Sequence, residues 1–240
     1  MHGLNVEQIP VLNDNYVYIL TCTETGQTAV VDPAVAAPVI HILGERPLDF
    51  IFNTHHHADH TGGNLQLKEH YDCVIVGAGH DAARIPGIDV KVREGDTVKL
   101  GHKVANVLET SGHTIGHIVY HFAESHALFC GDTLFVGGCG RLFEGTPEQM
   151  HESLQKIKVL PDETKVYCAH EYTLQNYKFL HHVAPEDAAV TARLNEVTQM
   201  REAGRRTVPS TLGQEKQSNL FLTAPSAKAF AELRKAKDHF

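Results

Sequence analysis

The chain has 240 residues, 42% of them apolar, with a formal charge of −8, which predicts an ordered protein of one large domain, or of one domain plus a small helical appendage. It lacks a basic stripe, an apolar run near the ~20 residues of a membrane span, and a signal or transit peptide, so neither nucleic acid nor membrane is an expected partner. Its five cysteines have no paired spacing, which is typical of reduced thiols and predicts a cytoplasmic protein.

The first part of the chain alternates short strands with helices. Two strands joined by a tight turn predict a hairpin, at residues 15–21 and 28–32. Buried strands and amphipathic helices then alternate, with helices at residues 35–45 and 62–71 and strands at residues 48–54 and 73–78.

The middle of the chain predicts more strands and one capped helix. A second hairpin is expected at residues 92–101 and 102–110, followed by strands at 117–122, 126–132 and 165–169, the last strand of the chain. Thr146, Pro147 and Gln149 form a helix start, with Thr as the cap, and that helix is expected to end near Leu160.

The pattern changes at Tyr172, after which helical stretches dominate. The clearest helical stretches are residues 186–206 and 225–240. We therefore predict an α/β domain at residues 1–171 and a helical domain at residues 172–240.

The segment THHHADH, residues 54–60, places four histidines and a carboxylate within seven residues. Alternate side chains of an extended loop point the same way, so His55 and His57 are expected to converge. After a turn, Asp59 and His60 would face the other side. This geometry predicts two metal positions close together.

Candidate ligands also follow three later strands. Sites in α/β proteins gather at the carboxyl ends of strands, where loops bring side chains together. A carboxylate can bridge two metals because it has two oxygens. The expected ligands are His55, His57 and His113 for one metal, Asp59, His60 and His170 for the other, and Asp132 as the bridge.

The ligand set indicates a catalytic site, because neither metal has a closed coordination sphere. Two divalent ions, two aspartates and a bridging hydroxide leave about one positive charge for a developing oxyanion. Water in such a site ionises near neutral pH, so hydrolysis of an activated carbonyl is the expected chemistry. Nitrogen and oxygen ligands suit zinc, and iron and manganese are also compatible.

Other histidines near these motifs have different expected roles. His56 is expected to orient its loop, and His117 to support a ligand or the fold. Cys139, in GGCGR, is expected to be a small buried thiol. The histidines outside the motifs are expected to be ordinary surface residues.

The ligand pattern resembles the metallo-β-lactamase superfamily, which implies a four-layer αββα sandwich and a binuclear metal site. SGHTIGH, GDTLF, GGCGRLFEGT and AHEYTLQN, together with the tail RKAKD, resemble the glyoxalase II (hydroxyacylglutathione hydrolase) family over essentially the whole chain. The resemblance implies hydrolysis of S-D-lactoylglutathione to glutathione and D-lactate, the second step of methylglyoxal detoxification. The expected nucleophile is a metal-bridging hydroxide, with Asp59 as a candidate proton acceptor.

The resemblance also implies residues that hold glutathione. Glutathione carries two carboxylates, which an acidic protein must meet with local cations. Phe143 stands where some relatives have a tyrosine, so it offers no hydroxyl, and Ala34 stands where a glycine is common. The expected substrate-binding residues are Arg141, Phe143, Tyr172, Arg234 and Lys237.

Four other functions compete with this interpretation. A persulfide dioxygenase of the same superfamily would carry one iron, so the metal count separates the two. A β-lactamase would not need a helical tail, and a nuclease of the superfamily would carry more basic residues than this chain does. A non-enzymatic metal-stabilised module would have a closed, cysteine-rich site. No pattern indicates an oligomer interface, so a monomer is expected.

Overall fold

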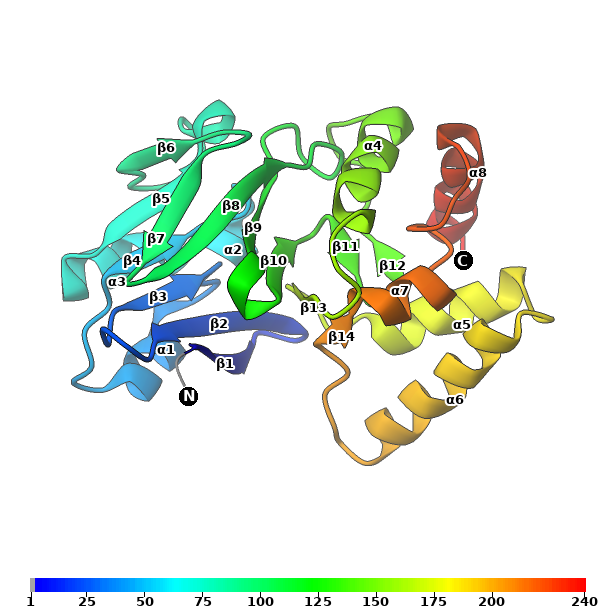
Figure 1. Cartoon of the computed structure of the whole chain (residues 1–240), viewed down its shortest axis with the longest axis horizontal. Helices are drawn as coiled ribbons and strands as arrows, with labels where there is room; N and C mark the ends of the chain where they lie inside the picture. Colours follow the sequence, from blue (N-terminus) through cyan, green and yellow to red (C-terminus); the bar gives the residue numbers. More distant parts are fainter. Residues whose placement is uncertain (1–2) are drawn as a thin grey trace.

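The computed structural model describes residues 3–240 and contains two six-stranded sheets packed against each other (Figure 1). The first sheet has the order β1 (Leu4–Val11), β2 (Asn15–Cys22), β3 (Thr28–Val31), β4 (Phe50–Phe52), β5 (Val74–Ala78) and β6 (Val90–Val92). The second has the order β14 (Ser210–Thr211), β13 (Lys165–Cys168), β10 (Ala127–Gly131), β9 (Ile118–Phe122), β8 (Lys103–Glu109) and β7 (Thr97–Leu100).

Helices α1 (Ala36–Leu43) and α3 (Asn64–Tyr71) cover the outer face of the first sheet and connect its parallel strands β3, β4 and β5. Strand β2 is buried on both faces because it lies between two layers. Val17 and Ile19 pack toward these helices, whereas Tyr18 and Leu20 join the core between the sheets.

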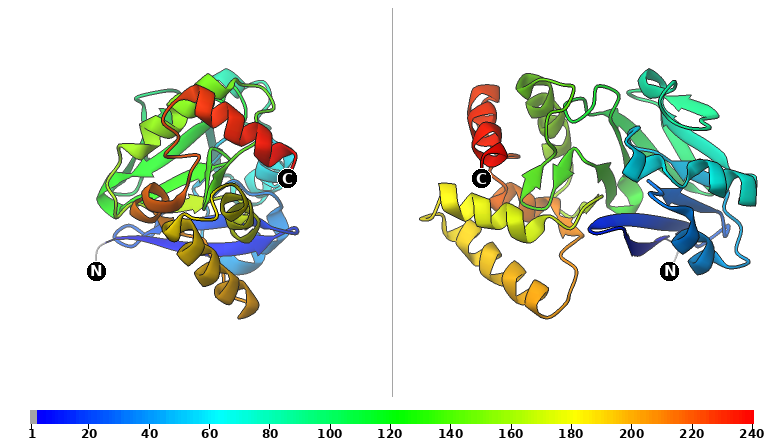
Figure 2. Two further views of the ribbon diagram at one scale, coloured as in Figure 1. Left: turned by 90° about the vertical axis from the view of Figure 1, so that its right-hand side faces the viewer. Right: turned by 180° about the vertical axis from the view of Figure 1, so that it is seen from behind.

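The later helices lie beside the second sheet, which gives the expected order of helix, sheet, sheet, helix (Figures 1 and 2). Helix α4 (Pro147–Lys158) starts with the predicted capping box, in which Thr146 and Gln149 bond each other's backbone N–H groups. It ends two residues before Leu160. These helices are α4 (Pro147–Lys158), α5 (Thr173–Val183), α6 (Ala188–Glu202), α7 (Leu212–Ser218) and α8 (Ala227–Asp238).

Several short elements were not predicted. Strand β1 pairs with β2 along its whole length, and β14 pairs with β13, so the strand at residues 165–169 is not the last one. These strands lack a strong pattern because they are short or lie at a sheet edge. The others are β6, α2 (Ala58–Thr61), the ribbon β11 (Leu134–Phe135) and β12 (Gly138–Cys139), and the short turns Gly79–Asp81 and Ala123–Ser125.

The helical tail is tied to the α/β part by buried polar contacts. Glu215 on α7 accepts a hydrogen bond from the Gly137 N–H at 2.8 Å. The Asn219 amide donates to the carbonyls of Phe135 and Gly138, each at 3.1 Å. The tail therefore supports the β11–β12 ribbon. Within residues 3–240, no helix has both the length and the apolar content to cross a bilayer.

Candidate metal centre and substrate cleft

Three histidines from two loops form the first group of facing nitrogens. His55 and His57 follow β4, and His113 lies in the loop between β8 and β9. Nδ1 of His57 lies 3.1 Å from Nε2 of His55 and 3.1 Å from Nε2 of His113. The rings of His55 and His57, two residues apart, thus turn to the same side, as predicted.

A second group lies next to the first. Asp59 and His60 belong to α2, and His170 follows β13. Oδ2 of Asp59 lies 3.7 Å from Nε2 of His60 and 3.5 Å from Nε2 of His170. Both histidines are buried, whereas the Asp59 side chain is 41% exposed and so faces the opening of the site.

Asp132 lies between the two groups at the end of β10. Its Oδ2 is 3.3 Å from Nε2 of His113. Its Oδ1 is 3.5 Å from Nε2 of His60 and 3.4 Å from Nε2 of His170. One carboxylate oxygen thus faces each group, which is the arrangement a bridging ligand needs.

His117 supports Asp132 and does not join the facing nitrogens. Its Nε2 accepts a hydrogen bond from the Asp132 backbone N–H at 3.1 Å. Its Nδ1 lies 3.0 Å from the hydroxyls of Thr110 and Thr133. Both ring nitrogens are therefore used by protein groups, in agreement with the supporting role expected for this residue.

His56 points away from the ligand groups, as predicted. Its Nδ1 lies 2.8 Å from a carboxylate oxygen of Asp81, a residue that is 2% exposed. Arg84 pairs with Asp81 at 2.5 Å and also with Glu144, whose pKa it lowers to about 2. This network joins the THHHADH loop to the loop that carries Phe143.

Sequence reasoning missed three residues that hold the ligand side chains: Asp14, Asn15 and Asp32. Asp32 follows β3 and lies 3.0 Å from Nδ1 of His60, while it accepts hydrogen bonds from the N–H and hydroxyl of Thr54. With its oxygens occupied in this way, Asp32 orients His60. The only sequence signal was an acidic residue at the end of a buried strand.

The donor set passes a simple test of fit for divalent metal ions. Nε2 of His60 and Oδ1 of Asp132 are buried and have no hydrogen-bond partner, which is costly unless a ligand satisfies them. Nitrogens about 2.0–2.1 Å from a tetrahedral zinc ion are separated by about 3.3 Å, close to the spacing of the first group. The site therefore binds divalent metal.

The electrostatics of the two groups differ. Burial lowers the pKa values of His55, His57 and His113, so these imidazoles are neutral at pH 7 with free lone pairs. Burial also acts to lower the pKa of His170, but nearby carboxylates, Asp132 foremost, raise it to about 9. The carboxylates of Asp59 and Asp132 thus favour a positive charge at the second group, which a bound cation would supply in place of the proton on His170.

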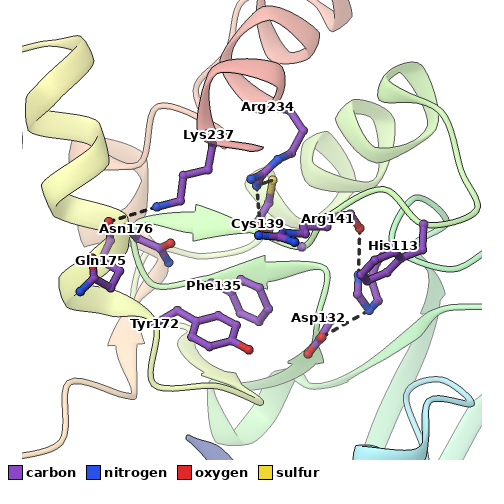
Figure 3. A pocket seen from close by; sticks show the side chains of 12 residues that line it. His113, Asp132, Phe135, Cys139, Arg141, Tyr172, Gln175, Asn176, Arg234 and Lys237 are labelled. Atoms are coloured by element: carbon purple, nitrogen blue, oxygen red, sulfur yellow. Dashed lines mark hydrogen bonds and ion pairs between the residues drawn. The ribbon is translucent and has the colours of Figure 1, made fainter. Parts of the chain in front are cut away.

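Two adjoining cavities open onto these residues. One, of about 400 Å³, is lined by residues of both ligand groups together with Phe143 and Tyr172. The other, of about 480 Å³, begins at His113 and Asp132 and extends toward α8, as Figure 3 shows. Because they share lining residues, they form one cleft that leads away from the metal ligands.

Aromatic side chains form the walls of this cleft. Tyr172 stacks parallel to His170 at a centroid distance of 4.7 Å. Phe143 lies edge-on to His57 and His113, at 5.7 and 5.2 Å, and is 64% exposed. These walls would confine a flexible substrate beside the ligand groups.

The three cations expected to bind substrate line the larger of the two cavities (Figure 3). Arg141 is exposed at its rim. Lys237 donates to the Gln175 carbonyl at 3.1 Å, and burial, together with the neighbouring arginines, lowers its pKa to about 8. Arg234 is only 5% exposed and bonds to the Cys139 carbonyl at 3.1 Å and to Asp238 at 2.7 Å.

Cys139 is buried as expected, and burial raises the pKa of its thiol to about 11. The group is therefore a neutral thiol near pH 7. Its Sγ lies 3.9 Å from the Arg234 guanidinium and is not among the facing ligand atoms of the described residues.

The fold and the ligand groups define a metallo-hydrolase of the αββα type, and comparisons with known proteins agree. Residues 11–170 match the metallo-beta-lactamase superfamily model, and residues 171–240 match the model of the hydroxyacylglutathione hydrolase C-terminus. The crystal structure of ETHE1 from Myxococcus xanthus is similar, with a TM-score of 0.75 and 28% identity over 96% of this chain and 90% of that one.

Relatives that match over their full length show which family of this superfamily the chain belongs to. The hydroxyacylglutathione hydrolase of Rhodospirillum rubrum is 50% identical and the alignment covers 100% of both chains. That of Methylococcus capsulatus is 48% identical over 99% of each chain. This chain belongs to the hydroxyacylglutathione hydrolase family, which confirms the resemblance noted in its motifs.

Proposed function

We propose that the protein hydrolyses S-D-lactoylglutathione to glutathione and D-lactate, with two divalent metal ions, zinc by preference, at the candidate site. Iron and manganese are the alternative metals for the same nitrogen and oxygen ligands. One observation carries the proposal. Two groups of facing ligands share Asp132 at the head of a cleft that is walled by aromatic rings and ends in cations.

The proposed metal ligands are those expected from the sequence. Bound ions at this site would supply water that ionises near neutral pH and positive charge for the developing oxyanion. The ligands assigned in this proposal are His55, His57 and His113 for one ion, Asp59, His60 and His170 for the other, and Asp132 shared by both.

The remaining residues bind and orient the thioester. Arg141 and Lys237 are assigned to the glutathione carboxylates, and Phe143 and Tyr172 to the walls that confine the chain next to the ligand groups. Asp59, whose carboxylate is 41% exposed at the opening, is assigned to accept a proton from the attacking water. The attacking oxygen forms the new C–O bond at the carbonyl carbon, the C–S bond then breaks, and glutathione leaves as the thiolate.

Arg234 has a different proposed role from the one expected. Each of its three nitrogens donates to Cys139 or Asp238, so we assign it to shaping the cleft wall rather than to a free ion pair with substrate. Its effect on substrate affinity then acts through the wall that it holds.

A matched pair of substrates tests recognition of glutathione. S-D-lactoylglutathione and the D-lactoyl thioester of N-acetylcysteamine share the reacting bond, but only the first carries the two glutathione carboxylates. We expect kcat/KM to be at least about 100-fold higher for the first, because each charge-assisted hydrogen bond contributes about 1.5–3 kcal/mol. Equal values would contradict the substrate assignment, and oxygen uptake with glutathione persulfide would indicate the dioxygenase instead.

The pH dependence of KM tests the role of Lys237. Its pKa is about 8, so the ammonium group that would bind a carboxylate is present below pH 8 and is lost as pH rises through that value. We expect the KM for S-D-lactoylglutathione to rise above about pH 8. In Lys237→Arg the cation persists, so the rise should disappear. A KM that stays flat in the wild-type enzyme would contradict this role.

The same proposal also covers the domain organisation, the oligomeric state and the cellular location of the protein. We propose residues 1–171 as the catalytic domain and residues 172–240 as the substrate-binding domain, because Lys237 and Tyr172 come from the tail. A monomer is proposed because no pattern in the sequence indicates an oligomer interface. A cytoplasmic location is supported by five buried cysteines without disulfides.

A further inference from the structure

The tip of the β1–β2 hairpin is fixed against the segment that carries His170. The backbone N–H of Tyr16 donates to the Ala169 carbonyl at 2.7 Å, and the N–H of Glu171 donates to the Asp14 carbonyl at 2.9 Å. Residues Asn15 and His170 form an isolated antiparallel bridge. These contacts hold the hairpin tip in register with the end of β13.

Two adjacent side chains of this tip reach two members of the second ligand group. Oδ1 of Asp14 lies 2.8 Å from Nδ1 of His170 and accepts a hydrogen bond from its N–H, while Nε2 of His170 faces the site. Nδ2 of Asn15 donates to Oδ2 of Asp59 at 3.0 Å and to the Asp59 carbonyl at 3.3 Å. The exposed carboxylate of Asp59 is thereby held toward the site.

The first ligand group receives its support from elsewhere. His55 Nδ1 lies 3.1 Å from the Thr54 hydroxyl. His113 Nδ1 donates to the Arg141 carbonyl at 2.9 Å. Among the hydrogen bonds of residues 3–240, none joins the hairpin tip to His55, His57 or His113. The tip therefore contacts one ligand group and not the other.

We propose that Asp14 and Asn15 are positioning residues that set the occupancy of the second metal position alone. The inference rests on the proposed two-metal site. A partner that orients a metal-binding histidine or carboxylate typically changes metal affinity about 10–100-fold when it is removed. Among the candidate ligands, the side chains of Asp14 and Asn15 contact only Asp59 and His170 within residues 3–240, so the loss of either side chain should weaken one of two binding steps.

The experiment measures bound Zn²⁺ per chain after the holoenzyme is dialysed against buffers of stepped free Zn²⁺. The wild-type enzyme should show two binding steps. In Asp14→Ala, the binding step that belongs to the first ligand group should stay unchanged. The other step should shift to about 10–100-fold higher free Zn²⁺. The Asp14 side chain is 39% exposed, so this variant should keep its fold, which circular dichroism checks.

Three more variants sharpen the result. Asn15→Ala should shift the same step as Asp14→Ala, whereas Asp14→Asn retains an oxygen acceptor for His170 and should restore most of the affinity. Asn13→Ala, at an exposed position of the same tip, should leave both steps unchanged. When Asp14→Ala is loaded with Co²⁺, the visible absorption of one of the two bound ions should differ from that in the wild-type enzyme.

The contradicting outcomes are distinct. Equal shifts of both steps in Asp14→Ala, or no shift of either, would overturn the inference and leave the proposed function intact. A wild-type enzyme that saturates with a single Zn²⁺ would contradict the two-metal proposal itself, and with it the inference.

Discussion

His57→Ala is expected to lose metal and hydrolysis together. Nδ1 of His57 faces Nε2 of both His55 and His113 at 3.1 Å, so its removal leaves the first group with two nitrogens. Metal ions contribute several kcal/mol of transition-state stabilisation, and each 1.36 kcal/mol is tenfold in rate, so kcat should fall about 10³-fold or more. Steady-state kinetics and metal analysis on the same preparation measure both effects.

The control for this variant is His41→Ala, which removes an exposed histidine of α1 that is not among the candidate ligands. It should retain the wild-type metal content and rate. If His57→Ala kept its metal and its turnover, His57 would not be a ligand and the first group would need a different assignment.

Arg234→Ala is expected to raise KM about tenfold, with kcat within a few-fold of the wild-type value, and to lower stability. The guanidinium bonds to the Cys139 carbonyl and the Asp238 carboxylate and lies 5.2 Å from the Phe221 ring centroid. Loss of the guanidinium leaves those polar groups without their hydrogen-bond partner, which costs about 1–3 kcal/mol of folding free energy. It also loosens the cleft wall. Kinetics and thermal unfolding measure the two effects.

Two further variants separate packing from recognition. Lys235→Ala, on the exposed side of the same helix, should change neither quantity. Arg141→Ala should raise KM without loss of stability, because its side chain is 68% exposed. A wild-type KM in Arg234→Ala would contradict the role assigned to this part of the tail.

Local patterns predicted the parts of the fold that depend on neighbouring residues. The hairpin of β2 and β3, the capping box at Thr146 and the buried strands before His55 and Asp132 each have a signal within a few residues. The candidate ligands converge because several of those strands end on the same side of the sandwich.

Long-range contacts account for what the sequence could not predict. Asp14 meets His170 across 156 residues, and Asn15 meets Asp59 across 44, so no spacing rule relates them. The sequence pattern of α8 is typical of a basic helix end that is exposed to solvent. Arg234 is nevertheless buried, because the fold brings Cys139, 95 residues earlier, against that helix.

The measurement that tests the central claim most directly uses one sample of wild-type enzyme. The rate at which the thioester of S-D-lactoylglutathione disappears is followed, and the metal per chain is determined on the same sample. We predict rapid hydrolysis with about two divalent ions bound. Full metal loading without hydrolysis would contradict the account, leave the fold standing, and move the function to another branch of the superfamily.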